Sequence, residues 1–209
     1  MRYRRSGLFI SATIMTFVLG FAVSAMAATL EHTFDDPTPT LFRGDKFGTS
    51  VALSGNNVLI GAPDDRSLGV SGQAHLFDAA TGGLLRTFND PTPTGVDKFG
   101  SSVALSSSTV LIGAPNHRIQ GDAVGQAHLF DATTGDLLQT FNDPTPTLLR
   151  RDRFGKSVAL YDDNVLIGAP DDNTQGARVG QAHLFDATTG DLLRTFNDPT
   201  LTGGDRFGI

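Results

Sequence analysis

The sequence predicts an all-β chain of repeated four-stranded antiparallel sheets, and three observations support this fold class. The 209 residues contain 24 glycines and 10 prolines but no tryptophan, a composition typical of short strands joined by many turns. Apolar residues at helical spacing are absent after residue 30. The pair Phe-Gly recurs at Phe47, Phe99, Phe154 and Phe207, at intervals of 52, 55 and 53 residues, so the chain is a repeat.

The first 27 residues differ from the rest of the chain. Several arginines open the sequence, and an almost uninterrupted apolar run extends from Gly7 to Ala25. Ala25-Met26-Ala27 then supplies the small residues that a signal peptidase requires. We therefore predict a signal peptide over 1–27 and an exported protein of the periplasm, cell surface or extracellular space. The alternative is an uncleaved membrane anchor, since the run is long enough to span a bilayer.

Charge and composition exclude several classes of function. Cleavage after Ala27 removes three arginines and no acid, so the formal net charge changes from −6 to −9. Such an acidic chain is disfavoured as a partner of nucleic acid, and no membrane insertion is expected after cleavage. Without cysteine there is no disulfide, thiol nucleophile or cysteine-based zinc site. Nucleophile-elbow, phosphate-loop and H-E-x-x-H motifs are also absent from the sequence, so we predict that the chain is not an enzyme.

Each repeat is expected to contain four short strands. In the first repeat these are Val51–Leu53, Val58–Ile60, Gln73–Phe77 and Leu84–Phe88. The turn Ser54-Gly55-Asn56-Asn57 joins the first two strands, and Asp78 to Gly82 joins the last two. Both turns are rich in residues that accept positive φ. Four antiparallel strands in about 50 residues are typical of one blade of a β-propeller.

The number of blades predicts an incomplete propeller. Full repeats are expected at about 47–98, 99–153 and 154–206, with partial repeats at 30–46 and 207–209. Leu30 to Phe34 is expected to form a leading fourth strand before three complete blades. A closed propeller has at least about four blades. The chain is then either a fragment of a longer propeller or an open arc that self-associates through its open blade edges.

Length variation predicts which face binds a ligand. The spacing from Phe-Gly to Gly-Ala-Pro, and from the GQA segment to Asn-Asp-Pro, is constant in all three repeats. All variation falls in the connections from strand two to three and out of strand four. Antiparallel strands place these two connections at the same end, and loops on a rigid scaffold are where binding usually occurs. The alternative is that they are tolerated insertions on an exposed rim.

The Phe-Gly, Gly-Ala-Pro and GQAHLFD segments together resemble the FG-GAP repeat, the blade unit of integrin α-subunit propellers. The short form found in bacterial exported proteins is similar to FGxSVAxxxxxVxxGAPxDD…GxAxxF. It is matched here from Phe47 to Phe77, Phe99 to Phe130 and Phe154 to Phe185. The resemblance implies a seven-bladed propeller in the complete architecture, used for extracellular recognition and cell adhesion rather than catalysis.

One departure from the integrin-type repeat concerns calcium. That repeat often carries a D-x-[DN]-x-[DN]-G loop between its first two strands, which supplies the many oxygens that calcium needs. The corresponding stretches here are Ser54–Asn57, Ser106–Thr109 and Tyr161–Asn164, and none is long enough to surround an ion. We therefore expect no cofactor and no metal. Calcium on the other face is the weaker alternative, with candidate ligands Asp64, Asp65, Asp171 and Asp172.

Carboxylates on the loop-bearing end are the candidate ligand-binding residues. Those that follow Gly-Ala-Pro, and their equivalents in the middle repeat, are Asp64, Asp65, Asn116, His117, Asp171 and Asp172. Those of Asn-Asp-Pro are Asp90, Asp143 and Asp198. Converging from several loops, they would suit a cation or a polar ligand. The alternative is that they accept hydrogen bonds from local backbone N–H groups in turns.

Histidine also recurs, at His75, His128 and His183 on the expected third strands. Third strands of different blades lie too far apart to share one zinc ion, so packing or a cross-strand hydrogen bond is expected. His32 and His117 have no histidine at the equivalent repeat positions and no adjacent cluster of ligands in the sequence.

A basic residue and an aspartate precede each Phe-Gly. The aspartates are Asp45, Asp97, Asp152 and Asp205. We expect them to cap the turn while the phenylalanine fills the space between blades; a charged ring that faces a ligand is the alternative.

The sequence thus predicts an exported, non-catalytic recognition or adhesion module that binds a protein or glycan through loops on one propeller face. Two alternatives stay open: a structural spacer in a surface or matrix protein, and a non-catalytic domain of a larger secreted protein. The identity of the ligand does not follow from these residues.

Overall fold

The computed structural model describes residues 31–39, 44–65, 72–147, 151–176, 178–200 and 204–209. The chain divides into two units, Met1–Glu31 and His32–Ile209, and every strand lies in the second. The predicted signal peptide, 1–27, lies outside the described residues. Within the described part, no helix is long and apolar enough to cross a membrane.

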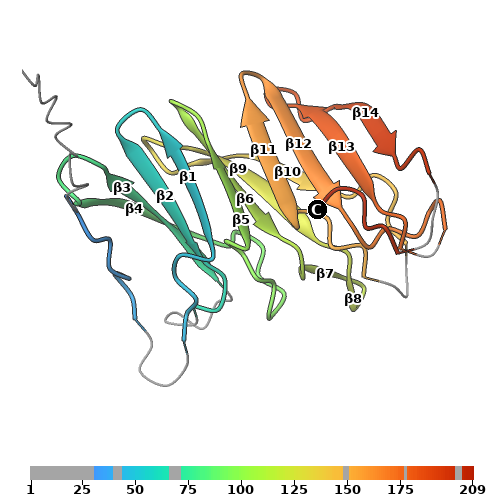
Figure 1. Ribbon diagram of the computed structural model, residues 1–209, viewed down its shortest axis with the longest axis horizontal. Coiled ribbons are helices and arrows are strands. Elements are labelled where there is room, and N and C mark those ends of the chain that lie inside the picture. Colours follow the sequence, from blue (N-terminus) through green and yellow to red (C-terminus); the bar gives the residue numbers. More distant parts are fainter. Residues whose placement is uncertain (1–30, 40–43, 66–71, 148–150, 177, 201–203) are drawn as a thin grey trace, which may run out of the picture. The chain divides into compact units, whose positions relative to one another are not determined.

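The described chain is all-β and contains three antiparallel four-stranded sheets, as predicted, each a propeller blade (Figure 1). Blade 1 consists of β1 Ser50–Ser54, β2 Asn57–Ala62, β3 Gln73–Asp78 and β4 Leu84–Asn89. Blade 2 consists of β5 Ser102–Leu105, β6 Thr109–Ala114, β9 Gln126–Asp131 and β10 Leu137–Asn142. Blade 3 consists of β11 Ser157–Tyr161, β12 Asn164–Ala169, β13 Gln181–Asp186 and β14 Leu192–Asn197. The blades number three in the described residues, so the propeller is incomplete.

A short hairpin in blade 2 was not expected from the sequence. Its strands are β7 Arg118–Ile119 and β8 Asp122–Ala123, and they pair within the connection from β6 to β9. Gln120 and Gly121, with φ of 54° and 96°, form its turn. Two consecutive residues of positive φ are what a tight hairpin requires, so the signal in the sequence was Gly121.

The expected leading strand, Leu30 to Phe34, is not formed over its described residues 31–34, and Leu30 lies outside them. No neighbouring strand is available to pair with this segment in the described part of the chain. Its aromatic packing is nevertheless that of a fourth strand: the ring of Phe34 lies 5.2 Å from that of Phe77. Phe88 of β4 lies at the same distance from Phe130 of the next blade.

The two motifs that define the repeat meet where neighbouring blades touch. A Cβ added to Gly61 would lie 2.1 Å from the carbonyl oxygen of Gly100, so only glycine permits this approach. The Ser50 hydroxyl donates to that same carbonyl at 2.8 Å. At the next junction, Gly113 and the carbonyl of Gly155 have the same relation, with 2.0 Å to the added Cβ. Gly-Ala-Pro and Phe-Gly are therefore complementary halves of one contact between blades.

The phenylalanine of the two Phe-Gly pairs that lie between described blades fills the junction, as predicted. Phe99 and Phe154 are fully buried. The ring of Phe99 packs edge-on against Phe130 at 6.1 Å, and Phe130 in turn contacts Phe88 of the preceding blade. Phe196 of β14, which occupies the place of Phe88, is 38% exposed because none of the described residues forms a blade beyond it.

Antiparallel pairing gives each blade two different ends (Figure 1). The turns β1–β2 and β3–β4, and their equivalents in the other blades, form what we call the hairpin face. The β2–β3 connection and the segment that leads from β4 to β5, with their equivalents, form the loop face. All the candidate ligand-binding residues lie on the loop face.

Candidate functional site

The two aspartates that follow Gly-Ala-Pro in blade 1 have opposite environments. The carboxylate of Asp64 is partly exposed and lies 2.8 Å from the ammonium of Lys46. It also contacts the ammonium of Lys98, from the next repeat. Asp65 is fully buried. The first aspartate therefore links two cations across a blade junction, and the second is directed into the protein.

Blade 3 repeats this division. Asp171 lies 3.1 Å from Arg153 Nε and 3.5 Å from Arg206 Nε, so it too accepts cations from its own and the following repeat. Asp172 is 1% exposed and is directed inward, like Asp65. The four aspartates of the calcium alternative are therefore separated: Asp64 and Asp171 contact cations at blade junctions, whereas Asp65 and Asp172 are directed inward.

In blade 2 the residue equivalent to Asp64 and Asp171 is Asn116, which has no charge. It lines a pocket of about 270 Å³ on the loop face. The other lining residues are Lys46, Thr49, Pro63, Lys98, Ser101, Pro115, Arg153 and Lys156. We call Lys46, Lys98, Arg153 and Lys156 the cationic rim. Three of these cations precede a Phe-Gly and have φ of 58° to 62°, a strained conformation that clusters at functional sites.

The inward residues form buried polar clusters between blades. The cluster at the junction of blades 1 and 2, which we call the second cluster, consists of Asp90, Asp97, His117 and His128. Each of these residues is at most 5% exposed. His117 Nδ1 lies 3.9 Å from Asp97 Oδ2, and His128 Nε2 lies 3.9 Å from Asp90 Oδ1. One ligand atom each from Asp90, Asp97 and His117 falls within 4.8 Å of the others.

Four segments from two blades supply this cluster. Asp90 follows β4 of blade 1, whereas Asp97 precedes the first strand of blade 2, His117 follows β6 and His128 lies in β9. His117 has no adjacent ligands in the sequence, and the fold brings its neighbours in the cluster together from distant segments. Asp97 was expected only to cap a turn; it does so, and it also belongs to the cluster.

Equivalent clusters lie at the two neighbouring positions. The first cluster is Asp36, Asp65 and His75. The third is Asp143, Asp152 and Asp172, with His183 beside Asp172. Asp36 was missed by sequence reasoning, although Asp36-Pro37-Thr38 matches Asp90-Pro91-Thr92 and gave the necessary signal. Asp198 begins the same arrangement after blade 3, where its carboxylate and that of Asp205 both accept from the Thr200 hydroxyl.

The Asn-Asp-Pro aspartates satisfy only part of their hydrogen-bonding capacity. Oδ1 of Asp90 and of Asp143 accepts a backbone N–H, from Thr92 and Thr145 respectively, at 2.9 Å. In both residues the buried Oδ2 has no hydrogen-bond partner in the described part of the chain. Turn capping therefore explains one carboxylate oxygen of each residue and leaves the other available.

The three recurring histidines make the expected cross-strand hydrogen bond. Nδ1 of His75, His128 and His183 lies 3.0, 3.2 and 3.1 Å from a threonine hydroxyl on the fourth strand. With Nδ1–H donating to the hydroxyl, Nε2 carries a lone pair. Nε2 of all three is buried and has no hydrogen-bond partner among the described residues. Each cluster thus contains an imidazole nitrogen that lacks a proton donor.

Burial shifts the titration of both kinds of group. Desolvation, supported by the neighbouring carboxylate of Asp97, raises the pKa of Asp90 to about 6. In the third cluster, desolvation and the charges of Asp152 and Asp172 raise the pKa of Asp143 to about 7. Burial lowers the pKa of His128 to about 4, so this imidazole is neutral at pH 7. A neutral His128 therefore gives no positive charge to the carboxylates of its cluster, and burial makes their ionised form unfavourable.

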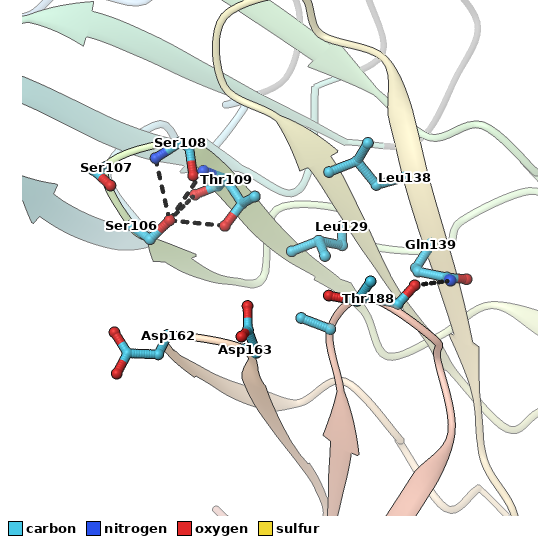
Figure 2. A pocket seen from close by; sticks show the side chains of 11 residues that line it. Ser106, Ser107, Ser108, Thr109, Leu129, Leu138, Gln139, Asp162, Asp163 and Thr188 are labelled. Carbon is cyan, nitrogen blue, oxygen red and sulfur yellow. Dashed lines mark hydrogen bonds between the residues drawn. The ribbon is translucent and has the colours of Figure 1, made fainter.

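A larger hollow lies on the hairpin face, opposite the predicted binding face (Figure 2). Its volume is about 700 Å³, and Ser106, Asp162, Asp163 and other polar side chains line it. Gln139 lines the hollow, and its side-chain amide donates a hydrogen bond to the carbonyl of Thr188 at 3.2 Å. The hollow lies between the turns of blades 2 and 3, where the sequence predicted neither a site nor a cavity.

The equivalent groove between blades 1 and 2 is smaller, about 270 Å³. Arg86 takes the place of Gln139 there and donates to the carbonyl of Thr133. Its longer side chain occupies space that glutamine leaves open. Arg86 in place of Gln139 is one of the differences between the two grooves, and the turns that line them differ as well.

Comparison with known proteins agrees with the repeat. The family model of the FG-GAP repeat matches residues 43–77, 93–130 and 149–185, together more than half of the chain. No curated protein matches the chain. The crystal structure of the computationally designed Ika4 protein is similar to it, with 21% identity, 78% of this chain and 79% of that chain covered, and a TM-score of 0.49.

A crystal structure of the computationally designed Ika8 protein is also similar, with 22% identity, 71% of this chain and 36% of that chain covered, and a TM-score of 0.47. Likeness at this level carries no argument about function. The repeat match does identify the family, in agreement with the Phe-Gly and Gly-Ala-Pro contacts between blades. The chain belongs to the FG-GAP repeat family.

Proposed function

We propose that this chain is an exported, non-catalytic recognition module that binds an anionic protein or glycan at the cationic rim of the loop face. The observation that supports this most directly is the lining of the Asn116 pocket. It contains four cationic side chains and, among the described residues, no acidic one. Lys46 and Arg153 are accessible to a ligand, with side chains 63% and 37% exposed.

The buried candidates do not serve this role. Asp65, Asp90 and Asp172 are at most 5% exposed, so a macromolecular ligand does not reach them directly. Recognition on the loop face therefore falls to the cations that surround Asn116. The expected ligand therefore changes. The carboxylates named from the sequence would suit a cation or a polar group, whereas the cationic rim suits a ligand that carries negative charge.

The repeat itself indicates what kind of group would bind. Asp64 and Asp171 each contact a pair of cations, whereas Asn116, which lines the same pocket as Lys98 and Arg153, has no charge. A carboxylate or sulfate of a ligand would supply the missing negative group. Guanidinium and ammonium groups bind such anions through charge-assisted hydrogen bonds.

The variant Asn116→Asp tests the proposal, because it supplies the missing carboxylate from the protein itself. We expect the purified chain to bind immobilised heparin or hyaluronan at low salt but not neutral dextran, and Asn116→Asp to bind at least tenfold more weakly. Asn164→Asp makes the same chemical change at an exposed position on the hairpin face and is the matched control. Equal binding by all three proteins would contradict the proposal, and a spacer role would then be favoured.

A second candidate site is the hollow on the hairpin face. Its lining contains hydroxyl and carboxylate groups, which favour an uncharged polyhydroxylated ligand such as a neutral glycan. Gln139→Arg would fill it, as Arg86 fills the neighbouring groove. Binding of a neutral oligosaccharide that is lost in Gln139→Arg but retained in Asn116→Asp would assign recognition to this face instead.

We also propose self-association through the open outer faces of blades 1 and 3. Val51 is 65% exposed, whereas its equivalent Val103 is 9% exposed against blade 1. Phe196 and Phe141 differ similarly, at 38% and 2%. Light scattering after gel filtration is expected to give a mass above that of the monomer, and Val51→Lys to restore the monomer. A monomeric wild-type chain at 100 µM would contradict this.

A further inference from the structure

We propose that Asp90, Asp97, His117 and His128 form a buried binding site for a zinc ion at the junction of blades 1 and 2. The site is distinct from the cationic rim and does not depend on the function proposed for that rim. It is also distinct from the turn between the first two strands, which is too short to hold an ion. Its ligand set, two imidazoles and two carboxylates, is one that a four-coordinate zinc ion accepts.

The structure brings ligand atoms of Asp90, Asp97 and His117 to within 4.8 Å of one another, and His128 Nε2 lies beside this group, next to Asp90. Two pairs lie 3.9 Å apart: His117 Nδ1 with Asp97 Oδ2, and His128 Nε2 with Asp90 Oδ1. Donor atoms of a tetrahedral site with bonds of about 2.0 Å lie about 3.3 Å apart, so closing each pair requires a movement of roughly half an ångström.

Unpartnered buried atoms give a second and independent indication of a ligand. Asp90 Oδ2, His117 Nδ1 and His128 Nε2 are all buried and have no hydrogen-bond partner in the part of the chain that the structure describes. Buried polar groups are otherwise almost always paired, because leaving one unpaired costs stability. A cation bound by His117 Nδ1 and by the carboxylates of Asp90 and Asp97, which lie within hydrogen-bonding reach of each other, would give these buried atoms a partner, with His128 Nε2 as the adjacent fourth ligand.

The surroundings of the ligands are those of a prepared metal site. The Thr140 hydroxyl lies 3.2 Å from His128 Nδ1, and with Nδ1–H as the donor the lone pair of Nε2 is left for a metal. Thr94 donates its N–H and its hydroxyl to the two oxygens of Asp97, at 2.5 and 2.6 Å. Such outer hydrogen bonds orient the ligands of a metal site. The ring of Phe99 packs on His128 and excludes water from that side.

Two nitrogen ligands favour zinc over calcium, which prefers six to eight oxygens. The first and third clusters differ on this point, because an aspartate, Asp65 or Asp172, stands where the second cluster has His117. Each therefore offers a single imidazole. These neighbours are internal controls: they share the backbone arrangement and differ in the chemistry of one ligand.

The direct test is zinc binding by the full chain after removal of metal with a chelator, measured by competition with a chromophoric zinc indicator. We expect one tight site in the wild-type chain and at least a 100-fold loss of affinity in His117→Asn, since replacing even an outer-shell partner of a zinc ligand costs 10–100-fold. His32→Asn removes a histidine outside the cluster and is expected to bind as wild type. Asp172→His is expected to gain a second zinc site.

A second measurement separates a metal ligand from a merely structural residue. Asp90→Asn keeps an acceptor for the Thr92 N–H but removes a charge from the metal-free cluster, so it is expected to melt at or above the wild-type temperature in chelator. It is also expected to lose the rise in melting temperature that zinc gives the wild type. The proposal is overturned if the wild type fails to bind zinc, if His117→Asn binds it equally well, or if Asp90→Asn lowers the melting temperature in chelator.

Discussion

The second and third clusters have the same architecture and differ in one ligand position. Asp90 corresponds to Asp143 and Asp97 to Asp152, but His117 stands where the third cluster has Asp172. The third cluster therefore concentrates three carboxylates, and the pKa of Asp143 is raised to about 7, compared with about 6 for Asp90. The comparison teaches that the repeat determines the geometry of the cluster, while one side chain sets its charge and its preference for a cation.

The framework that the two clusters share should respond equally to the loss of its aromatic residue, and this is the largest effect that we expect. Phe99→Ala and Phe154→Ala remove fully buried rings from equivalent junctions. Each should lower the free energy of unfolding by about 3–5 kcal/mol, measured in urea. Phe196→Ala, at the exposed equivalent of Phe141, should cost about 1 kcal/mol or less. A large difference between Phe99→Ala and Phe154→Ala would show that the junctions are not equivalent.

Zinc should distinguish the two clusters. At a free zinc concentration 100 times the dissociation constant, the wild-type chain should gain about 2.7 kcal/mol of stability. His117→Asp converts the second cluster to the ligand set of the third and should abolish most of this gain. Thermal melts with zinc and with chelator measure it. A variant that keeps the full zinc effect would mean that His117 is not a ligand.

Without metal, removal of one carboxylate from the third cluster should stabilise the folded chain more than the same change in the second cluster. Asp143→Asn removes the most strongly perturbed of three carboxylates, whereas Asp90→Asn acts on a pair. We expect Asp143→Asn to raise the free energy of unfolding by about 1 kcal/mol or more at pH 8 in chelator, because a buried group with no partner is costly. The gain from Asp90→Asn should be smaller. The reverse order would contradict the assignment of greater repulsion to the third cluster.

The smallest expected effect concerns the opposite face of the same junctions. Gln139→Arg should fill the hollow between blades 2 and 3 in the way that Arg86 fills the groove between blades 1 and 2. Stability should change by no more than about 0.5 kcal/mol, as for most exposed substitutions. A crystal structure of the variant should show the two grooves with similar volumes. An unchanged hollow would mean that residue 139 does not control its size.

Much of the fold could be predicted because its signals are local and repeated. The strands β2, β3 and β4 contain the predicted segments and extend them by one or two residues at each end at most. The leading strand could not be predicted correctly from its sequence alone. Leu30 to Phe34 resembles a fourth strand, but a strand requires a partner to pair with, and pairing is a property of the surrounding fold.

The candidate site was only partly predictable for the same reason. Asp90 and His128 are 38 residues apart in the sequence, and each has a sufficient local role, as a turn acceptor and as a cross-strand donor. Only the fold brings His128 Nε2 to 3.9 Å from the carboxylate of Asp90. The outward and inward directions of Asp64 and Asp65 likewise depend on the next blade, whose Lys98 contacts the first of them.

The measurement that tests the central claim most directly is anomalous diffraction at the zinc absorption edge from crystals of the zinc-loaded chain. The account predicts a peak between His117 Nδ1 and His128 Nε2, with bonds of about 2.0–2.1 Å to nitrogen, and two further ligands from Asp90 and Asp97. A crystal with full diffraction and no zinc at this junction, or with zinc only at His32, would contradict it.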